Sequence, residues 1–316
     1  MNLVTSELRV QAAEEIQEGL CFCLSMPLNL PGGNSVNPKR FPPKFGAVFH
    51  PPGSEHPYYN MDWNALQAGN MDVTSDECIT LYSQYSTQWD SFAHVGSRFD
   101  ADGDGEAEMV YYNGFKPGEH IKGPYDSGGM GARALGVENM ARGGMQGRGV
   151  LVDLQRHFGN ERVSVNYEML MAIFEKDGVV IEEGDFFLFH TGWDTMILSM
   201  NGRPDANKLH SSGAVLDGFD EKILKWITES GIVAVISDNM AIEDSLGYGN
   251  THGGCSRLPL HRHCLFRLGV HLGELWYLSE LAHALRERNR SRFFLTAPPL
   301  RIPGAVGSPT TPIATI

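Results

Sequence analysis

The strongest constraint on the fold is a short run at residues 232–236, Ile-Val-Ala-Val-Ile, in which every side chain is apolar. Because such a run has no polar face to present to water, we expect a strand that is covered on both sides. An amphipathic helical pattern at 220–230 precedes it and ends at a glycine. Two further apolar runs, at 149–153 and 185–190, are separated by another helical pattern. Strands that alternate with helices predict an α/β fold.

A long segment near the N-terminus departs from this pattern. From Pro27 to Tyr59 the chain is dense in Pro, Gly and Asn, which indicates a loop. Loops of this length in compact domains are usually functional or disordered, and disordered segments lack aromatic side chains. This one carries Phe41, Phe45, Phe49, Tyr58 and Tyr59. We therefore predict one domain over residues 1–316, with a packed lid or insert loop across 27–76.

The composition excludes several classes of partner. The formal net charge is −13 and no block of Lys and Arg interrupts it, so nucleic acid and anionic membrane surfaces are disfavoured. No stretch approaches the roughly 20 apolar residues of a membrane span, and the first residues lack the apolar core of a signal peptide. Five scattered cysteines predict no disulfide framework. We expect a cytoplasmic protein that acts on a small-molecule substrate.

One segment, residues 85–94, concentrates side chains that could carry chemistry. On an extended strand Gln88 and Asp90 point to the same face, and His94 follows after a short turn. An amide oxygen, a carboxylate and an imidazole together can bind a divalent cation or transfer a proton. The structural alternative is that Asp90 caps a turn while His94 is a buried, hydrogen-bonded histidine. Spacing alone does not separate these two interpretations.

A second group lies far downstream in the chain. His252, His261, His263 and His271 are followed closely by Glu274. Neutral imidazole is the commonest protein ligand for metals, and a carboxylate completes a partly charged site. The alternative is a polar helix with exposed histidines. We expect one of these histidines, rather than all of them, to be a ligand.

A third candidate is the Asp238-Asn239 pair, which follows the apolar run at 232–236. In open α/β sheets ligands bind outside the carboxyl ends of the strands, so polar residues there are candidates for a site. A helix cap or a turn at Asp238 explains the same residues equally well.

Several of these segments, taken in order, resemble the cyclase family that includes bacterial kynurenine formamidase and isatin hydrolase. The matching pieces lie at 87–94 (Thr-Gln-Trp-Asp-Ser-Phe-Ala-His), 148–153, 184–193, 235–239, 261–281 and 299–314. The resemblance implies a single domain with a swivelling β/β/α fold, a mixed central sheet and long lid loops. It also implies a homodimer or homotetramer.

The family signature, His-x-Gly-Thr-His-x-Asp-x-Pro-x-His, matches only in its last part. Asp90 falls on the metal-bridging aspartate, and His94 falls on the last histidine, the proposed proton donor. Gln84 and Gln88 stand where the family has its two leading histidines. The family's downstream His and Glu ligands correspond to Glu274 with either His261 or His263, and the sequence leaves that choice open.

The two glutamines change the expected metal site. Amide oxygens are weaker ligands for zinc than imidazoles, so we expect one ion instead of two. Asp90, Glu274 and a downstream histidine (His261 or His263) would hold it, helped by Gln88. Such a set of ligands suits Mn²⁺ or Zn²⁺.

The resemblance and these residues together predict a metal-dependent hydrolase. It would cleave an amide, ester or lactone bond of a small cyclic or aromatic molecule by metal-activated water. Asp90 and His94 would be the catalytic residues, and aromatic side chains of the lid would shape an apolar pocket. The chain has no Gly-x-Ser-x-Gly nucleophile motif.

Two other functions remain open from the sequence. The first is a polyketide or lactone cyclase, or a lyase, in which Asp90 and His94 move protons without net hydrolysis. The second is a metal-free binding protein that keeps the scaffold without its ligand histidines.

Overall fold

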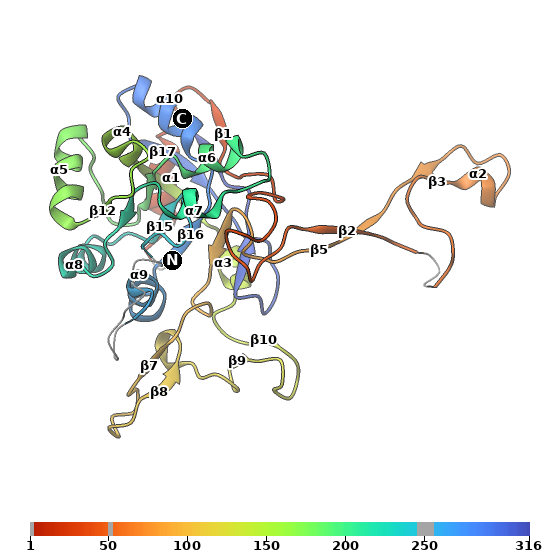
Figure 1. Cartoon of the computed structure of the whole chain (residues 1–316), viewed down its shortest axis with the longest axis horizontal. Coiled ribbons are helices and arrows are strands. Elements are labelled where there is room, and N and C mark those ends of the chain that lie inside the picture. The colour runs from red at the N-terminus through yellow and green to blue at the C-terminus, as the bar shows by residue number, and fades with distance from the viewer. Residues whose placement is uncertain (1–2, 50–52, 245–255) are drawn as a thin grey trace.

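The computed structural model describes residues 3–49, 53–244 and 256–316, and its centre is a nine-stranded sheet (Figure 1). Four neighbouring strands of this sheet are parallel, and the strands on either side of them are antiparallel. In spatial order the strands are β1 (Cys21–Cys23), β19 (Ile313–Thr315), β17 (Arg292–Thr296), β11 (Gln146–Asp153), β13 (Phe186–His190), β15 (Ala234–Ser237), β16 (His271–Glu274), β6 (Gln88–Asp90) and β18 (Gly307–Pro309). The predicted α/β class with a mixed central sheet is confirmed.

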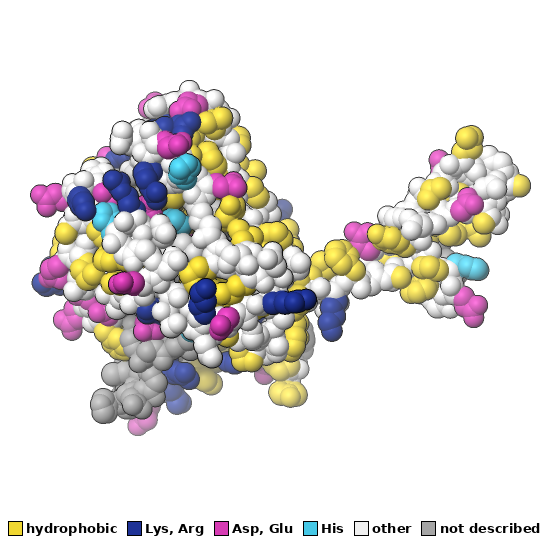
Figure 2. Space-filling view, turned by 45° about the horizontal axis from the view of Figure 1, so that its top comes forward, with side chains coloured by type: hydrophobic (Ala, Val, Ile, Leu, Met, Phe, Trp, Pro, Cys, Tyr) yellow, Lys and Arg dark blue, Asp and Glu magenta, His cyan; other side chains and the backbone are white. Residues whose placement is uncertain are grey.

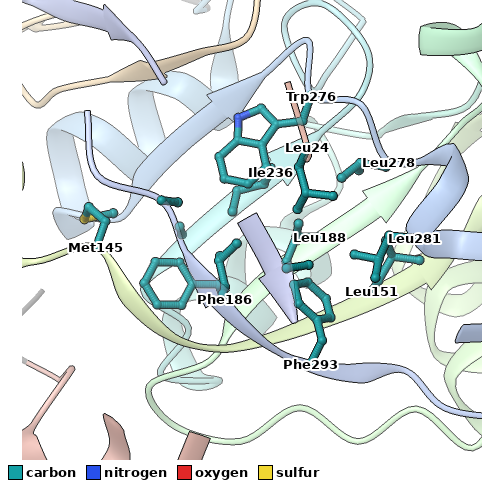
Figure 3. Packing of buried hydrophobic residues seen from close by; sticks show 14 of the residues in the cluster. Leu24, Met145, Leu151, Phe186, Leu188, Ile236, Trp276, Leu278, Leu281 and Phe293 are labelled. Atoms are coloured by element: carbon teal, nitrogen blue, oxygen red, sulfur yellow. The ribbon is translucent and has the colours of Figure 1, made fainter. Parts of the chain in front are cut away.

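Side chains of the parallel strands enter two separate hydrophobic clusters, one on each face of the sheet. On β13, Phe186 and Leu188 belong to the cluster that includes α3 (Val137–Gly143) and α10 (Ser279–Glu287), part of which Figure 3 shows. Phe187 and Phe189 point the other way, into the cluster that includes α5 (Tyr167–Asp177) and α8 (Glu221–Glu229). All four side chains are fully buried. Each contributes about 2–3 kcal/mol through burial of apolar surface, which explains why these strands are apolar at every position.

Several helices begin at polar side chains that accept hydrogen bonds from their first turns. Thr5 caps α1 (Ser6–Ala13), Asn166 caps α5 and Asp220 caps α8. The remaining helices are α2 (Trp63–Leu66), α4 (Leu154–Phe158), α6 (Trp193–Ser199), α7 (Ala206–His210) and α9 (Pro259–His261), with a 3-10 turn η1 (Tyr112–Gly114) and a π-helix η2 (Arg262–Leu268). Within the described ranges, none of the helices has the length and apolar character needed to cross a membrane.

Sequence patterning missed four strands of the central sheet, β16, β17, β18 and β19, and β16 is the one that builds the site described below. Residues 258–268 carry helical periodicity, and the structure gives them to α9 and η2. The four residues of β16 follow, and they begin and end with the polar residues His271 and Glu274. A strand this short has no periodicity of its own. It is defined by its neighbours β15 and β6, which pair with it on its two edges.

The structure divides the segment predicted as a lid into two parts. Leu30 and Val36 are buried in a small cluster against α6 and α7, so the first part packs on the body of the protein. From residue 44 the chain instead forms a long two-stranded arm that projects away from the body (Figure 1). The arm is built from β2 (Lys44–Ala47), β3 (Met61–Asp62), β4 (Val73–Thr74) and β5 (Glu77–Thr80).

Six short strands pair outside both the central sheet and the arm. They are β7 (Ser97–Phe99), β8 (Glu108–Val110), β9 (Ile121–Lys122), β10 (Gly131–Ala132), β12 (Ser164–Val165) and β14 (Val215–Leu216).

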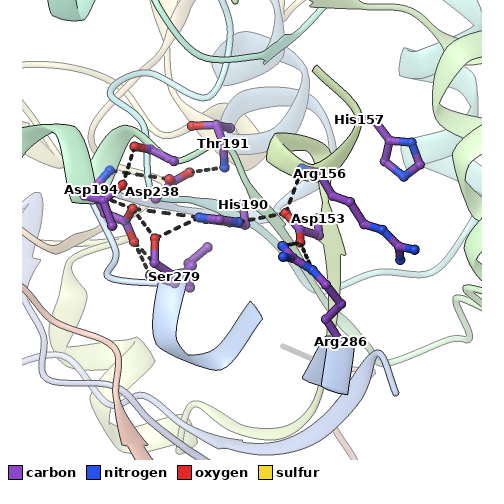
Figure 4. A network of polar contacts seen from close by, with 12 residues as sticks. Asp153, Arg156, His157, His190, Thr191, Asp194, Asp238, Ser279 and Arg286 are labelled. Carbon is purple, nitrogen blue, oxygen red and sulfur yellow. Dashed lines mark hydrogen bonds and ion pairs between the residues drawn. The ribbon is translucent and has the colours of Figure 1, made fainter. Parts of the chain in front are cut away.

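A buried polar network lies at the carboxyl ends of β11, β13 and β15 (Figure 4). Asp238 accepts hydrogen bonds from the backbone N–H groups of Thr191 (2.8 Å) and Trp193 (2.9 Å). Asp194 accepts backbone bonds at the start of α10, from Leu278 (2.8 Å) and Ser279 (2.9 Å). These carboxylates therefore tie loops together, and Asp238 has a structural role, although it bonds a distant loop and not its own turn.

The same network extends through His190 to Asp153. The two ring nitrogens of His190 lie 2.9 Å from Asp153 Oδ1 and 2.9 Å from Ser279 Oγ. Arg286 also binds Asp153, through its Nε at 3.1 Å and its Nη2. Burial alone would raise the pKa of Asp153, but the bonds with His190 and Arg286 lower that pKa to about 2.

This pKa predicts how the stability of the fold depends on Asp153 and on pH. Because the carboxyl binds a proton less readily in the folded chain than in the unfolded chain, its stabilising contribution is present above pH 4. That contribution is lost as the pH falls towards about 2. We expect Asp153→Asn to lower the free energy of unfolding at pH 7 by about 2 kcal/mol. Urea unfolding at pH 7 and at pH 3 measures the difference, which should narrow at the lower pH. Asp72→Asn, on the exposed arm, is the matched control, and equal unfolding midpoints for the two variants would contradict the prediction.

Candidate metal and catalytic site

The pairing of β16 with β6 brings together residues that are far apart in the sequence. In this antiparallel ladder Glu274 lies opposite Gln88, and Leu272 lies opposite Asp90. Side chains opposite each other on paired strands share one face of the sheet. The amide Nε2 of Gln88 accordingly donates to Glu274 Oε2 at 3.2 Å. Asp90 and Glu274 thus form the floor of a site, and both are buried.

His261, at the end of α9, lies among three buried carboxylates. Its Nε2 is 3.0 Å from Glu274 Oε1 and 3.8 Å from Asp90 Oδ2. Its Nδ1 is 2.9 Å from Glu243 Oε1. Burial disfavours the charged imidazole, but the bonds to Glu243 and Glu274 dominate and raise the pKa of His261 to about 10. Since a metal binds neutral imidazole, metal uptake at this site would release that proton.

Glu243 orients His261 and was not anticipated from the sequence. It accepts hydrogen bonds from the backbone N–H groups of Leu260 (2.8 Å) and His261 (3.0 Å) as well as from the imidazole. These bonds cap the first turn of α9, where Leu258 offers no side-chain cap. A carboxylate bonded to the outer nitrogen of a ligand histidine fixes its ring orientation and tautomer. One signal in the sequence could have identified Glu243. It follows the carboxyl end of β15 closely, as Asp238 does.

Asp90 has one carboxylate oxygen without a partner. Its Oδ1 accepts a hydrogen bond from the amide of Gln84. Among the described residues nothing donates to its Oδ2, although that atom is fully buried. Burial raises the pKa of Asp90, and the neighbouring Glu274 raises it too, while His94 and His261 lower it. An unpaired buried carboxylate oxygen is costly, and a bound cation would satisfy it.

The residues at this point fit a divalent metal ion. Asp90, His261 and Glu274 each offer one ligand atom, and these atoms lie within 4.8 Å of one another. One imidazole nitrogen with two carboxylate oxygens is a common ligand set for Zn²⁺ and is also compatible with Mn²⁺. Gln88 lies beside this group, but its Oε1 faces Arg40 at 3.5 Å and its Nε2 donates to Glu274. In this orientation its amide supports Glu274.

The structure brings His94 to the site and leaves His263 outside it. The Nε2 of His94 is 3.9 Å from Asp90 Oδ2, and its side chain is 22% exposed where it borders a cavity. The Nε2 of His263 instead lies 2.9 Å from Thr228 Oγ1 and 2.9 Å from the Leu224 carbonyl. The geometry therefore favours His261 in the choice that the sequence left open.

His271 takes no part in the cluster. The ring of His271 stacks on Phe92 with a centroid distance of 4.0 Å, and burial lowers the pKa of His271 to about 3. It is thus a neutral core residue. His252 lies outside the described residues.

A cavity of about 350 Å³ opens beside His94, His261 and Glu274. The other residues that line it are Asn37, Lys39, Arg40, Met240, Ala241, Arg257 and Leu258. Among the described residues no aromatic side chain lines this cavity, so the expected aromatic lining is wrong, whereas Met240, Ala241 and Leu258 do give it apolar surface. Trp89 instead packs in the core against Trp276, at 5.1 Å between ring centroids. Polar and charged side chains of the N-terminal loop form the wall.

Comparison with known proteins supports a common architecture. A family model named Cyclase matches residues 24–244, and no curated protein matches the sequence. A solved structure described as a novel cyclase is 29% identical with a TM-score of 0.75, over 100% of this chain and 92% of that chain.

Two more distant structures share the fold. Isatin hydrolase A from Labrenzia aggregata, bound to benzyl benzoate, is 15% identical with a TM-score of 0.59, over 96% of this chain and 94% of that chain. A predicted metal-dependent hydrolase from Bacillus stearothermophilus is 17% identical with a TM-score of 0.51, over 94% of this chain and 98% of that chain.

The placement of the two histidines predicts opposite effects of their substitution on metal binding. We expect His261→Asn to weaken the binding of Mn²⁺ or Zn²⁺ by a factor of about 100 or more, because it removes a ligand. His263→Asn should bind like the wild type. Titration calorimetry with each metal, supported by elemental analysis of the purified proteins, measures both. Equal affinities for the two variants would show that His261 is not a ligand.

Proposed function

This chain belongs to the cyclase family, and on that premise we propose that it is a metal-dependent hydrolase of a small molecule. The bond that it cleaves is an amide, ester or lactone, and the substrate is cyclic or aromatic. One divalent ion, Mn²⁺ or Zn²⁺, is held by Asp90, His261 and Glu274. The attacking group is water.

The observation that carries this proposal is the unpartnered oxygen of Asp90. Oδ2 is buried, faces His261 at 3.8 Å, and completes a set of ligands at the inner end of the cavity. A structural carboxylate would have donors on both oxygens, as Asp238 does in the same sheet. Asp90 is therefore arranged for a ligand that the protein itself does not supply.

When bound, a divalent ion lowers the pKa of a coordinated water and polarises a carbonyl group. The residues of the chain supply the rest of the chemistry. Glu274 and Asp90 hold negative charge at the inner end of the cavity, and Glu243 keeps the ring of His261 in place. Asp90 also accepts the proton that leaves the attacking water. Burial of all three carboxylates excludes bulk water from this end of the cavity.

His94 is the proton donor in this proposal. It lines the cavity and is partly exposed, so it reaches a leaving nitrogen or oxygen of a substrate. Its Nε2 also lies 3.9 Å from Asp90 Oδ2, so the proposed proton donor stands beside the proposed base. This gives the pair the roles of base and acid.

The names of structural neighbours support this reaction class. One neighbour is an isatin hydrolase solved with the product analogue thioisatinate, 12% identical with a TM-score of 0.56, over 99% of both chains. Others are named as metal-dependent hydrolases. The alternatives are a cyclase or lyase that uses Asp90 and His94, and a metal-free binding protein.

Kinetics of a His94 variant test the mechanism. The metal-loaded protein is assayed against lactones, cyclic amides, formamides and aryl esters, with mass analysis of each product for added water. We expect His94→Gln to lower kcat by a factor of about 10²–10⁴, because it removes the proton donor while metal content stays unchanged. His283→Gln, an exposed histidine on α10, is the matched control.

Each alternative predicts a different result in this assay. A product without added water indicates a lyase or cyclase. A protein that takes up neither Mn²⁺ nor Zn²⁺ and binds small molecules without converting them is a metal-free binding protein. Wild-type kcat in His94→Gln removes His94 from the mechanism.

We also propose that the protein is a cytoplasmic homodimer or homotetramer joined through its arm. In Figure 2 hydrophobic side chains lie along the arm. The exposed ones include Phe45, Phe49, Tyr59, Leu66, Met71, Val73 and Ile79. A two-stranded ribbon is marginally stable alone in water, and exposed apolar surface of this kind marks an interface. A second copy of the chain is the partner, because a two-fold assembly covers both arms with one set of contacts.

The mass of the protein in solution tests the arm interface. Phe45 and Ile79 lie opposite each other in the β2–β5 ladder, so they share one face. We expect the wild type to have the mass of a dimer or tetramer by light scattering. The double variant Phe45→Ser, Ile79→Ser should shift it towards monomer, because the interface loses apolar area. Val10→Ser, an exposed apolar residue on α1, is the control. A monomeric wild type would refute the interface.

A further inference from the structure

The wall of the cavity is positively charged although the chain as a whole is acidic. Lys39, Arg40 and Arg257 line it, against the single carboxylate of Glu274. The whole chain has 25 Lys and Arg residues against 38 Asp and Glu residues. The cavity therefore reverses the balance of charge found in the rest of the sequence. Such local reversal attracts a ligand of the opposite charge.

Among the described residues, no direct ion pair neutralises the positive charges of this wall, although Arg40 acts at longer range on Asp90 and Glu274 and lowers the pKa of each. Across residues 3–49, 53–244 and 256–316, no carboxylate lies within ion-pair distance of Lys39, Arg40 or Arg257. Glu274 already contacts His261 and accepts a hydrogen bond from Gln88. The Oδ1 atom of Asp90 accepts a hydrogen bond from Gln84. A divalent ion bound at these carboxylates would make the cavity more positive still.

Arg40 is held in place by neutral acceptors only. Its Nη1 donates to the Gln84 carbonyl at 2.6 Å and lies 3.5 Å from Gln88 Oε1. Among the described residues, its Nε and Nη2 have no acceptor in hydrogen-bond range. A guanidinium with one edge fixed and another edge open is suited to a bidentate bond with a carboxylate.

The loop that carries Arg40 is itself anchored to the body. The backbone N–H of Gly32 donates to the Tyr85 hydroxyl at 2.9 Å, and that hydroxyl donates to the Gly33 carbonyl at 2.8 Å. Gly32 also lies so close to Gly202 that a Cβ atom would come within 2.2 Å of the Gly202 oxygen. The position of Arg40 is therefore set before any ligand arrives, which lowers the entropic cost of binding.

Arg40 also lies close to the reacting end of the cavity. The side chain of Gln88 joins them, since its Oε1 faces Arg40 and its Nε2 donates to Glu274. A ligand group bound to Arg40 is thus one amide side chain away from the carboxylates at the inner end.

From these contacts we infer that the substrate carries its own carboxylate, a few bonds from the bond that is cleaved, and that Arg40 binds it with Lys39 and Arg257 at the mouth. This inference rests on the proposed function and narrows its substrate class to acidic amides, esters or lactones. Neutral analogues of the same shape bind in the cavity without this contact and are poorer substrates. Arg40 is in this sense a specificity-determining residue.

Binding of a matched pair of ligands tests the inference without any turnover. Benzoate and benzamide have the same size, and only benzoate is charged. We expect titration calorimetry of the metal-loaded wild type to show benzoate binding at least about 10-fold tighter than benzamide. Arg40→Gln should remove most of that preference, and Lys39→Gln should weaken it while leaving the buried site untouched. Arg301→Gln, an exposed arginine outside the cavity, should keep it. The preference should also shrink as salt concentration rises.

The outcomes separate this inference from the proposed function. Equal binding of benzoate and benzamide by the wild type, no binding of either, or an unchanged preference in both Arg40→Gln and Lys39→Gln would overturn the inference. Hydrolysis of phenyl acetate and 4-acetoxybenzoate is then compared. Equal kcat/KM values for the two esters would likewise count against a substrate carboxylate, while the hydrolase function would stand. If neither these esters nor the wider panel of amides and lactones is cleaved, but the benzoate preference holds, the proposed function fails and the acidic ligand remains.

Discussion

The short ladder between β16 and β6 is the contact on which the candidate site depends. It places Glu274 beside Gln88 and Asp90 in the buried interior, where an unpaired carboxylate costs free energy. The imidazole of His261 compensates part of that negative charge through its contact with Glu274. Glu243 adds a further carboxylate on the other ring nitrogen of His261. The result is an excess of buried negative charge around one imidazole. A divalent cation is the simplest group that balances it.

A second cluster of similar composition lies at the carboxyl ends of the neighbouring strands. A comparison of the two clusters explains why only the one around Asp90 is a candidate site. His190, Asp194 and Asp238 also place potential ligand atoms within 4.8 Å of one another. Their carboxylates, however, receive backbone N–H bonds from the starts of α6 and α10, and His190 bridges Asp153 and Ser279. Those groups are satisfied within the protein, and they join loops at the ends of three strands. The Oδ2 atom of Asp90, by contrast, receives no hydrogen bond from the described residues, and a cavity opens beside the cluster.

The N-terminal segment predicted as a lid has two structural roles. Its first part is tied down by Tyr85 and Gly202 and places Arg40 on the wall of the cavity. Its second part leaves the body as the arm, whose apolar side chains have no cover within the described chain. Both parts are rich in Pro and Gly, so one compositional signal covers two different structures. Local composition predicted a loop for both parts, whereas the second part forms the short paired strands of the arm.

What the sequence determined by itself is local. Apolar runs predicted β13 and β15, because a strand covered on both faces must be apolar at every position. The amphipathic pattern at 220–230 predicted α8. The spacing of Gln88, Asp90 and His94 predicted one side of the site, since all three lie on one strand and its following turn.

The residues on the other side of the site were decided only by the tertiary structure. The four residues of β16 become a strand because β15 and β6 pair with them. The choice between His261 and His263 depends on the turn of α9 into η2, which sends one ring to Glu274 and the other to Thr228. Glu243 and Arg40 enter the site through hydrogen bonds across long separations in the chain. Such contacts are set by how strands and loops meet in space, and that information is absent from any short stretch of the sequence.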